Sequence, residues 1–174
     1  FIGGKLALAS DPNQSKPSYG LYDLAKPDQF DGLLLTSDVA HGTTPEELKG
    51  FSDLFTGIPI VTQSVEMDGA SIFIPDNTEG MRAAVRHLIE EHGYKRIAFI
   101  RGIDGQLDAK QRFQAYKDEL KAHNLRYDEN LVVDGDFTNE SGRVAIRVLL
   151  DERKLRFQAV VAANDTMAFG ALDA

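Results

Sequence analysis

The sequence lacks cysteine, and basic residues are few, with 19 Lys and Arg against 27 Asp and Glu and a formal net charge of −8. Without cysteine there is no disulfide, thiolate metal site or cysteine nucleophile, a composition that fits a cytoplasmic location. The acidic balance argues against a DNA-binding or membrane-surface patch in this segment, because both require clustered Lys and Arg. A nucleic-acid partner would therefore be reached only through a module outside this chain.

Long apolar runs and enzyme signatures are also missing. No stretch approaches the roughly 18 apolar residues of a membrane span. The sequence contains no nucleophile elbow, phosphate loop, dinucleotide fingerprint or H-E-x-x-H pair. Asp104 and Asp108 are the nearest approach to an acid–base carboxylate pair, but nothing fixes their separation. We therefore expect no catalytic residues, no cofactor and no enzymatic activity.

The four histidines give no sign of a metal site. His87 and His92 are five residues apart and would project in different directions from one helix. We therefore predict that neither is a metal ligand.

What is present is an alternation of strands and helices, clearest between residues 71 and 104. Residues 71–74 form a predicted strand that stops at Pro75, and a helix capped by Asp76 or Asn77 runs to Gly93. A buried strand follows at 96–100. A strand–helix–strand unit of this kind normally has two parallel, buried strands.

The rest of the chain repeats this pattern. Thr44-Pro45-Glu46-Glu47 forms a helix start with a capping box. The alternation predicts an α/β architecture with doubly wound, mostly parallel sheets. Further strands are expected at 1–8, 30–36, 59–62, 131–133 and 159–163, and further helices at 19–25, 44–55, 108–122, 139–154 and from 164 onward.

In doubly wound folds, ligands bind beyond the carboxyl ends of the strands. Arg112, on the helix at 108–122, presents a planar fork of donors that suits vicinal hydroxyls or a carboxylate, although pairing with Asp108 is an equally good explanation. An asparagine amide such as that of Asn164 both donates and accepts, which suits a sugar hydroxyl. Polar residues at the expected strand ends are Ser37, Asp38, Gln63, Ser64, Asp76, Asn77, Arg101, Asp104, Asp136, Asn164 and Asp165.

Several segments in order resemble the sensor core of the LacI/GalR regulators, a type I periplasmic-binding-protein fold. They are Asp76-Asn77 with His87-Leu88-Ile89 and His92-Gly93, the strand at 96–100 with Gly102, Arg112 with Tyr116, Gly135-Asp136-Phe137 with Ser141-Gly142, and residues 163–171. The resemblance is fairly specific over residues 71–174 and looser over 1–70. Ala115 stands where the family usually has glycine.

The resemblance implies a two-lobed protein, with residues 1–93 in an N-terminal lobe and 94–174 in a C-terminal lobe. Both lobes would be incomplete, because the family's first strand and helix should precede Phe1 and its return strands should follow Ala174. Residues 1–28 are then expected to be poorly anchored or paired with another copy of the chain.

The resemblance also implies a function. It indicates the ligand-sensing domain of a LacI-type transcriptional regulator, a homodimer that clamps a small polar metabolite between its lobes, with a sugar as the leading candidate. Alternatives are the input domain of a histidine kinase or diguanylate cyclase, an extracytoplasmic transport protein, or an α/β enzyme acting on sugars. By position, the residues expected to contact ligand are Asp76, Asp108, Arg112, Asn164 and Asp165.

Overall fold

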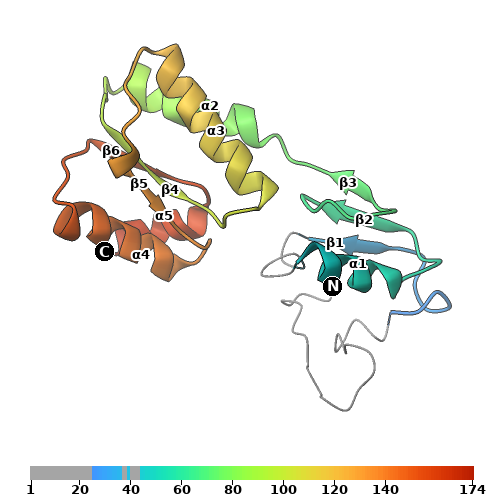
Figure 1. Cartoon of the computed structure of the whole chain (residues 1–174). Helices are drawn as coiled ribbons and strands as arrows, with labels where there is room; N and C mark the ends of the chain where they lie inside the picture. The colour runs from blue at the N-terminus through green and yellow to red at the C-terminus, as the bar shows by residue number, and fades with distance from the viewer. Residues whose placement is uncertain (1–24, 37–38, 40–43) are drawn as a thin grey trace. The chain divides into compact units, whose positions relative to one another are not determined.

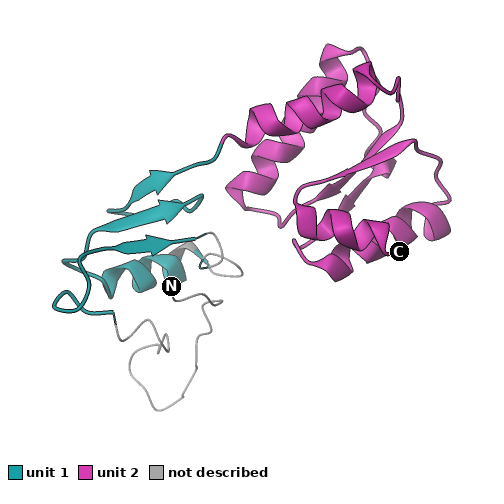
Figure 2. Ribbon diagram, turned by 180° about the vertical axis from the view of Figure 1, so that it is seen from behind, with its two compact units in different colours: residues 1–75 teal, residues 76–174 magenta. Residues whose placement is uncertain are grey.

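The computed structural model describes residues 25–36, 39 and 44–174. The strand expected at 1–8, nearly all of the helix at 19–25, and Ser37 and Asp38 lie outside these residues, as does most of the 1–28 segment expected to be poorly anchored. The chain divides into two compact units, Phe1–Pro75 and Asp76–Ala174 (Figure 2).

The division falls before α2 (Asn77–Glu90), whereas the sequence placed it after Gly93. The reason is that α2 packs along α3 (Leu107–Ala122) and places Val85 in the core of the second unit. The helix therefore belongs with the strands that follow it.

In the first unit, three parallel strands lie in the order β1-β2-β3: β1 (Leu33–Leu35), β2 (Ile60–Gln63) and β3 (Ser71–Phe73). Helix α1 (Pro45–Asp53) lies against this sheet (Figure 1) and contributes the fully buried Phe51 to the core. Its capping box is as predicted: Thr44 Oγ1 accepts from the Glu47 amide at 3.2 Å, and the Glu47 carboxylate accepts from the Thr44 amide at 2.7 Å.

In the second unit, three parallel strands lie in the order β5-β4-β6, namely β4 (Ile97–Arg101), β5 (Val132–Asp134) and β6 (Ala159–Ala162). Helices α2 and α3 cover one face of the sheet, and α4 (Asn139–Arg147) and α5 (Asp165–Leu172) cover the other (Figure 1). A 3-10 turn at Glu129–Leu131 leads into β5, and α4 continues as a π-helical turn at Val148–Glu152. The centre of the core is β4, whose residues 97–100 are at most 2% exposed.

The α/β class and the parallel sheets are confirmed, but the expectation that both strands flanking α2 are buried was wrong for β3. Strand β3 pairs with β2 in the first sheet, while β4 lies between β5 and β6 in the second. Strand β3 is also exposed, with Phe73 60% accessible. The helix between them packs on the second sheet, so this strand–helix–strand unit connects two sheets rather than building one.

Within the described part of the chain, no helix combines the length and the apolar character needed to cross a bilayer.

Candidate functional site

Arg112 lies at the centre of a polar cluster in the second unit. Its Nε donates to Asn77 Oδ1 at 2.9 Å, and its Nη1 donates to the carbonyl oxygen of Ala163, just past β6, at 2.6 Å. Its Nη2 lies 3.9 Å from Asp108 Oδ2, one helical turn earlier on α3. The guanidinium is thus held from three directions and faces the carboxyl end of the sheet.

Asn77 is the buried member of the cluster, at 5% exposed. Its Nδ2 donates to Asp108 Oδ1 at 2.8 Å and to Gln111 Oε1 at 2.9 Å, while its Oδ1 accepts from Arg112. Both ends of the amide are therefore occupied. Asn77 fixes the side chains of α3 relative to the first turn of α2.

The charged members remain partly accessible, with side-chain exposures of 15% for Asp108 and 26% for Arg112. Two of the five N–H groups of the Arg112 guanidinium are used in the hydrogen bonds described above. A carboxylate that accepts and a guanidinium that donates, side by side, suit a ligand whose hydroxyl groups do both. The cluster thus has the chemistry of a polyol site.

The other residues predicted to bind ligand are close in sequence to members of this cluster. The Asp76 carboxylate caps α2, accepting from the amides of Thr78 and Glu79 at 3.0 Å each. Asn164 caps α5 through Met167 N at 3.0 Å and follows Ala163, the carbonyl partner of Arg112. Asp165 is exposed in the first turn of α5. A ligand role for these three stays a prediction.

Asn164 also holds a strained turn. Its Nδ2 donates at 3.1 Å to the carbonyl oxygen of Phe137, a residue with a φ of 69°. A bulky side chain rarely adopts this left-handed conformation. The capping hydrogen bond and this second one leave one Nδ2 hydrogen of Asn164 for another acceptor.

Residues at the other strand ends form separate groups. Arg101 at the end of β4 pairs with Asp134 at the end of β5. Hydrogen bonds to Asp136, chiefly from the Thr138 side chain, lower the pKa of its carboxyl group below the ordinary range. Gln63 and Ser64 lie in the first unit, where Ser64 has a φ of 60°.

Asn77 was named from the sequence as a polar residue at a strand end but not among the residues expected to contact ligand, and Gln111 was not named at all. The dipeptide at 76–77 offered two helix-capping side chains, and the structure gives the cap to Asp76 and the buried contacts to Asn77. Gln111 precedes Arg112 on α3 and carried no signal of its own. Both roles depend on contacts between residues that are 31 to 35 positions apart in the sequence.

The side chains of His87 and His92 do not point apart as their spacing predicted. The Nε2 atoms of His87 and His92 are 3.2 Å apart, although their spacing predicted divergence. The reason is that α2 ends at Glu90, so His92 is not on the helix and folds back beside His87. Among the described residues, no group of three or more His, Cys, Asp or Glu is arranged to hold a metal ion.

Comparisons with known proteins agree with this fold. Residues 85–174 match the family described as periplasmic binding protein-like domain. The chain is 38% identical over 144 residues to the HTH-type transcriptional regulator CelR of Thermobifida fusca, covering 82% of this chain and 41% of CelR. It is 34% identical to the ribose operon repressor of Escherichia coli K12, covering 84% of this chain and 43% of the repressor.

Among solved structures, a CelR–cellobiose complex superposes with a TM-score of 0.69 at 37% identity, covering 83% of this chain and 43% of that one. The chain therefore spans less than half the length of these relatives.

Proposed function

The chain belongs to the family of periplasmic binding protein-like domains, in the form found as the sensor core of LacI/GalR regulators, and from this premise we propose that its Arg112 cluster binds a carbohydrate. The carbohydrate's hydroxyl groups donate to the Asp108 carboxylate and accept from the Arg112 guanidinium. Asp76, Asn164 and Asp165 border the same site and supply further polar contacts.

The observation that carries this proposal is the fixation of Arg112 by Asn77, Asp108 and the Ala163 carbonyl. Free arginine side chains lose considerable rotamer entropy when they bind a ligand, whereas a guanidinium already held in place does not. The CelR structure contains cellobiose, and another relative is named for ribose. These two sugars are therefore the first ligands to test.

The test is calorimetric titration of the purified chain with cellobiose and D-ribose, comparing wild type with Arg112→Lys. Lysine keeps the charge but cannot form the planar fork. The expected loss in affinity is about 10- to 100-fold, since hydrogen bonds to charged groups contribute roughly 1.5–3 kcal/mol.

The matched control is Arg126→Lys, at an exposed position after α3, which should bind as wild type does. Equal affinities of Arg112→Lys and wild type for the sugar would contradict the assignment of Arg112.

We also propose that the segment acts without turnover, as the cytoplasmic sensor of a transcriptional regulator that contacts DNA through a module outside this chain. The regulators it resembles and its formal net charge of −8 support the assignment of ligand sensing to this segment and of DNA contact to another. Footprinting of the full-length gene product with and without the bound sugar tests it. Tight DNA binding by this segment alone, or hydrolysis of the sugar, would contradict it.

We further propose that the chain dimerises through α5. Phe169 is 63% exposed and Leu172 is 81% exposed, a large apolar surface for one short helix. Light scattering should report a dimer for wild type and a monomer for Phe169→Glu. The control, Tyr127→Glu at a second exposed aromatic, should remain dimeric. A monomeric wild-type protein would refute this proposal.

A further inference from the structure

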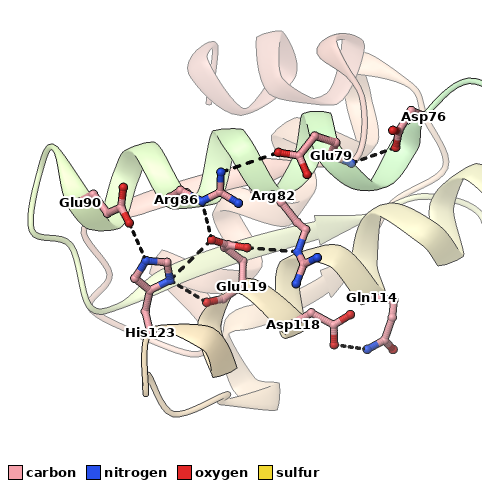
Figure 3. Close-up of polar contacts among 9 residues, drawn as sticks. All are labelled: Asp76, Glu79, Arg82, Arg86, Glu90, Gln114, Asp118, Glu119 and His123. Carbon is pink, nitrogen blue, oxygen red and sulfur yellow. Dashed lines mark hydrogen bonds and ion pairs between the residues drawn. The ribbon is translucent and has the colours of Figure 1, made fainter.

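A second polar cluster connects α2 and α3, the two helices that also carry Asn77 and Arg112 (Figure 3). At its centre is Glu119, which is charged yet only 2% exposed. Glu119 Oε1 accepts from Arg86 Nε at 2.9 Å, and Oε2 accepts from Arg82 Nε at 3.2 Å. One carboxylate on α3 thus receives two arginines from successive turns of α2.

Two peripheral contacts extend this cluster. Arg86 Nη1 lies 3.7 Å from Glu79 on its own helix, and its bond with Glu119 raises the pKa of the Arg86 guanidinium. At the far end, His123 Nε2 lies 3.0 Å from Glu90 Oε1, while its Nδ1 lies 3.6 Å from Glu119 Oε1. Carboxylates and cations therefore alternate along the helix pair.

A buried carboxylate joins two helices at a substantial cost in desolvation free energy. Its desolvation costs several kcal/mol, and apolar side chains of similar volume often give equal or greater stability. The advantage of ionic contacts is geometric, because hydrogen bonds constrain distance and direction as apolar contacts do not. Two hydrogen bonds to opposite oxygens of one carboxylate fix both the rotation of α2 about its axis and its position along α3.

The Glu119 contacts lie on the same helix–helix interface as the proposed ligand site. The contacts occur in the same order along both helices: Asn77 with Asp108 at their starts, Arg82 and Arg86 with Glu119 further along, and Glu90 with His123 at their ends. Glu119 is seven residues after Arg112, two turns along the same face of α3. An error of one residue in the helix alignment would displace Asn77 by about 1.5 Å relative to Arg112.

We propose that Glu119 is a positioning residue for the carbohydrate site, which it serves by setting the alignment of α2 on α3. Glu119 itself touches no ligand in this arrangement. It holds the two helices so that Asn77 reaches Arg112 and Asp108 together. The inference rests on the proposed function, because it assigns Glu119 to the site that Arg112 forms.

The test compares wild type with Glu119→Gln and with a triple variant, Arg82→Met/Glu119→Leu/Arg86→Met. The first removes the charge at constant size and the second replaces the whole ionic cluster with apolar side chains, which should fold at least as stably. Asp53→Asn, which breaks the exposed Lys49–Asp53 pair of the first unit, is the control for loss of an ion pair.

Three quantities are measured on each protein: the unfolding midpoint, the affinity for cellobiose at 10 °C, and the hydrogen exchange of the Asn77 side-chain amide by NMR. The amide signal requires no ligand and reports whether Asn77 still donates to Asp108 and Gln111. We expect cellobiose affinity to fall about tenfold or more in both Glu119 variants, with faster Asn77 exchange, because small misplacements of site groups are costly. Asp53→Asn should match wild type in all three quantities.

A triple variant with wild-type affinity and wild-type Asn77 exchange would overturn the proposal. The proposal would also be overturned if Glu119→Gln lowered the unfolding midpoint but left the cellobiose affinity and the Asn77 exchange rate at 10 °C unchanged. Glu119 would then contribute to stability alone. If wild type fails to bind cellobiose, the carbohydrate assignment is what fails. The Asn77 exchange still decides the role of Glu119.

Discussion

Gly170 of α5 passes so close to Asn139 of α4 that a Cβ on the glycine would lie 1.8 Å from the Asn139 carbonyl oxygen. The reverse contact is similar, since a Cβ on Gly142 of α4 would lie 2.1 Å from the Met167 carbonyl oxygen of α5. The two helices therefore meet backbone to backbone, and each needs glycine where they touch.

Gly170→Ala should consequently destabilise the second unit by about 2 kcal/mol or more, because the added methyl group forces the helices apart. Urea unfolding followed by circular dichroism measures the effect. The control is Gly80→Ala in α2, where a Cβ would have no neighbour within 4 Å. That change should raise stability by about 1 kcal/mol through helix propensity. Equal effects of the two substitutions would contradict the close-contact explanation.

Tyr116→Phe should cost about 1–3 kcal/mol. The Tyr116 hydroxyl donates to the Ile97 carbonyl oxygen at 2.8 Å and is buried with it, so removing the donor leaves that acceptor without this partner. The same burial raises the pKa of the Tyr116 hydroxyl, so the donor stays protonated at neutral pH. Tyr127→Phe, at a ring 37% exposed, is the matched control and should change the unfolding free energy by less than about 0.5 kcal/mol. Indistinguishable effects would argue against the Ile97 hydrogen bond.

Stability should depend on pH through His123. The Glu90 carboxylate, followed by the Glu119 carbonyl, raises the pKa of His123 above the value near 6.5 expected of the unfolded chain. The stabilising contribution of the protonated ring is therefore complete below about pH 6.5 and is lost as pH rises through the higher folded-state pKa.

Urea midpoints of wild type and His123→Gln, compared between pH 5.5 and pH 9, isolate this contribution because the other ionisable groups are common to both proteins. The two midpoints should differ most at acid pH and converge at alkaline pH. A gap that is constant, or that widens with rising pH, would contradict the Glu90 contact.

Thr44→Ala should destabilise α1 by about 1 kcal/mol, because alanine has no hydroxyl to accept from the Glu47 amide, although the backbone N–H at position 44 can still donate to the Glu47 carboxylate. Hydrogen exchange of amides 46–48 should accelerate, while that of β4 in the second unit should not change. Thr44→Ser is the control, since serine caps equally well. Acceleration of the same size in Thr44→Ser would show that the hydroxyl is not responsible.

Local features of this fold could be predicted from the sequence, whereas features that depend on distant contacts could not. The capping box at Thr44 and the left-handed Gly93, with a φ of 67°, depend on side chains within four residues and were predicted correctly. The burial of residues 97–100 followed from a continuous apolar run. By contrast, the exposure of β3 and the packing of α2 on the second sheet depend on distant contacts, and no short-range pattern encodes them.

The site shows the same division. The pairing of Arg112 with Asp108 was predictable because they are four residues apart on one helix, and Nη2 lies 3.9 Å from Oδ2 in the structure. Their partner Asn77 comes from a different helix. Asn77 rather than Asp76 contacts them because Asn77 is the buried residue of the two. The approach of His92 to His87 depends on the chain leaving the helix at Glu90. Each of these outcomes is fixed by tertiary packing rather than by spacing.

The strand order β5-β4-β6 also determines how long β4 lacks one of its partner strands during synthesis. Strand β4 is central, yet its β6 neighbour begins only at Ala159. On a ribosome adding about 5–20 residues per second, one edge of β4 therefore waits roughly 3–12 s for its partner. During that interval the strand presents unpaired amides and apolar side chains on the nascent chain, so the emerging polypeptide offers a binding site for a chaperone that the finished protein has closed.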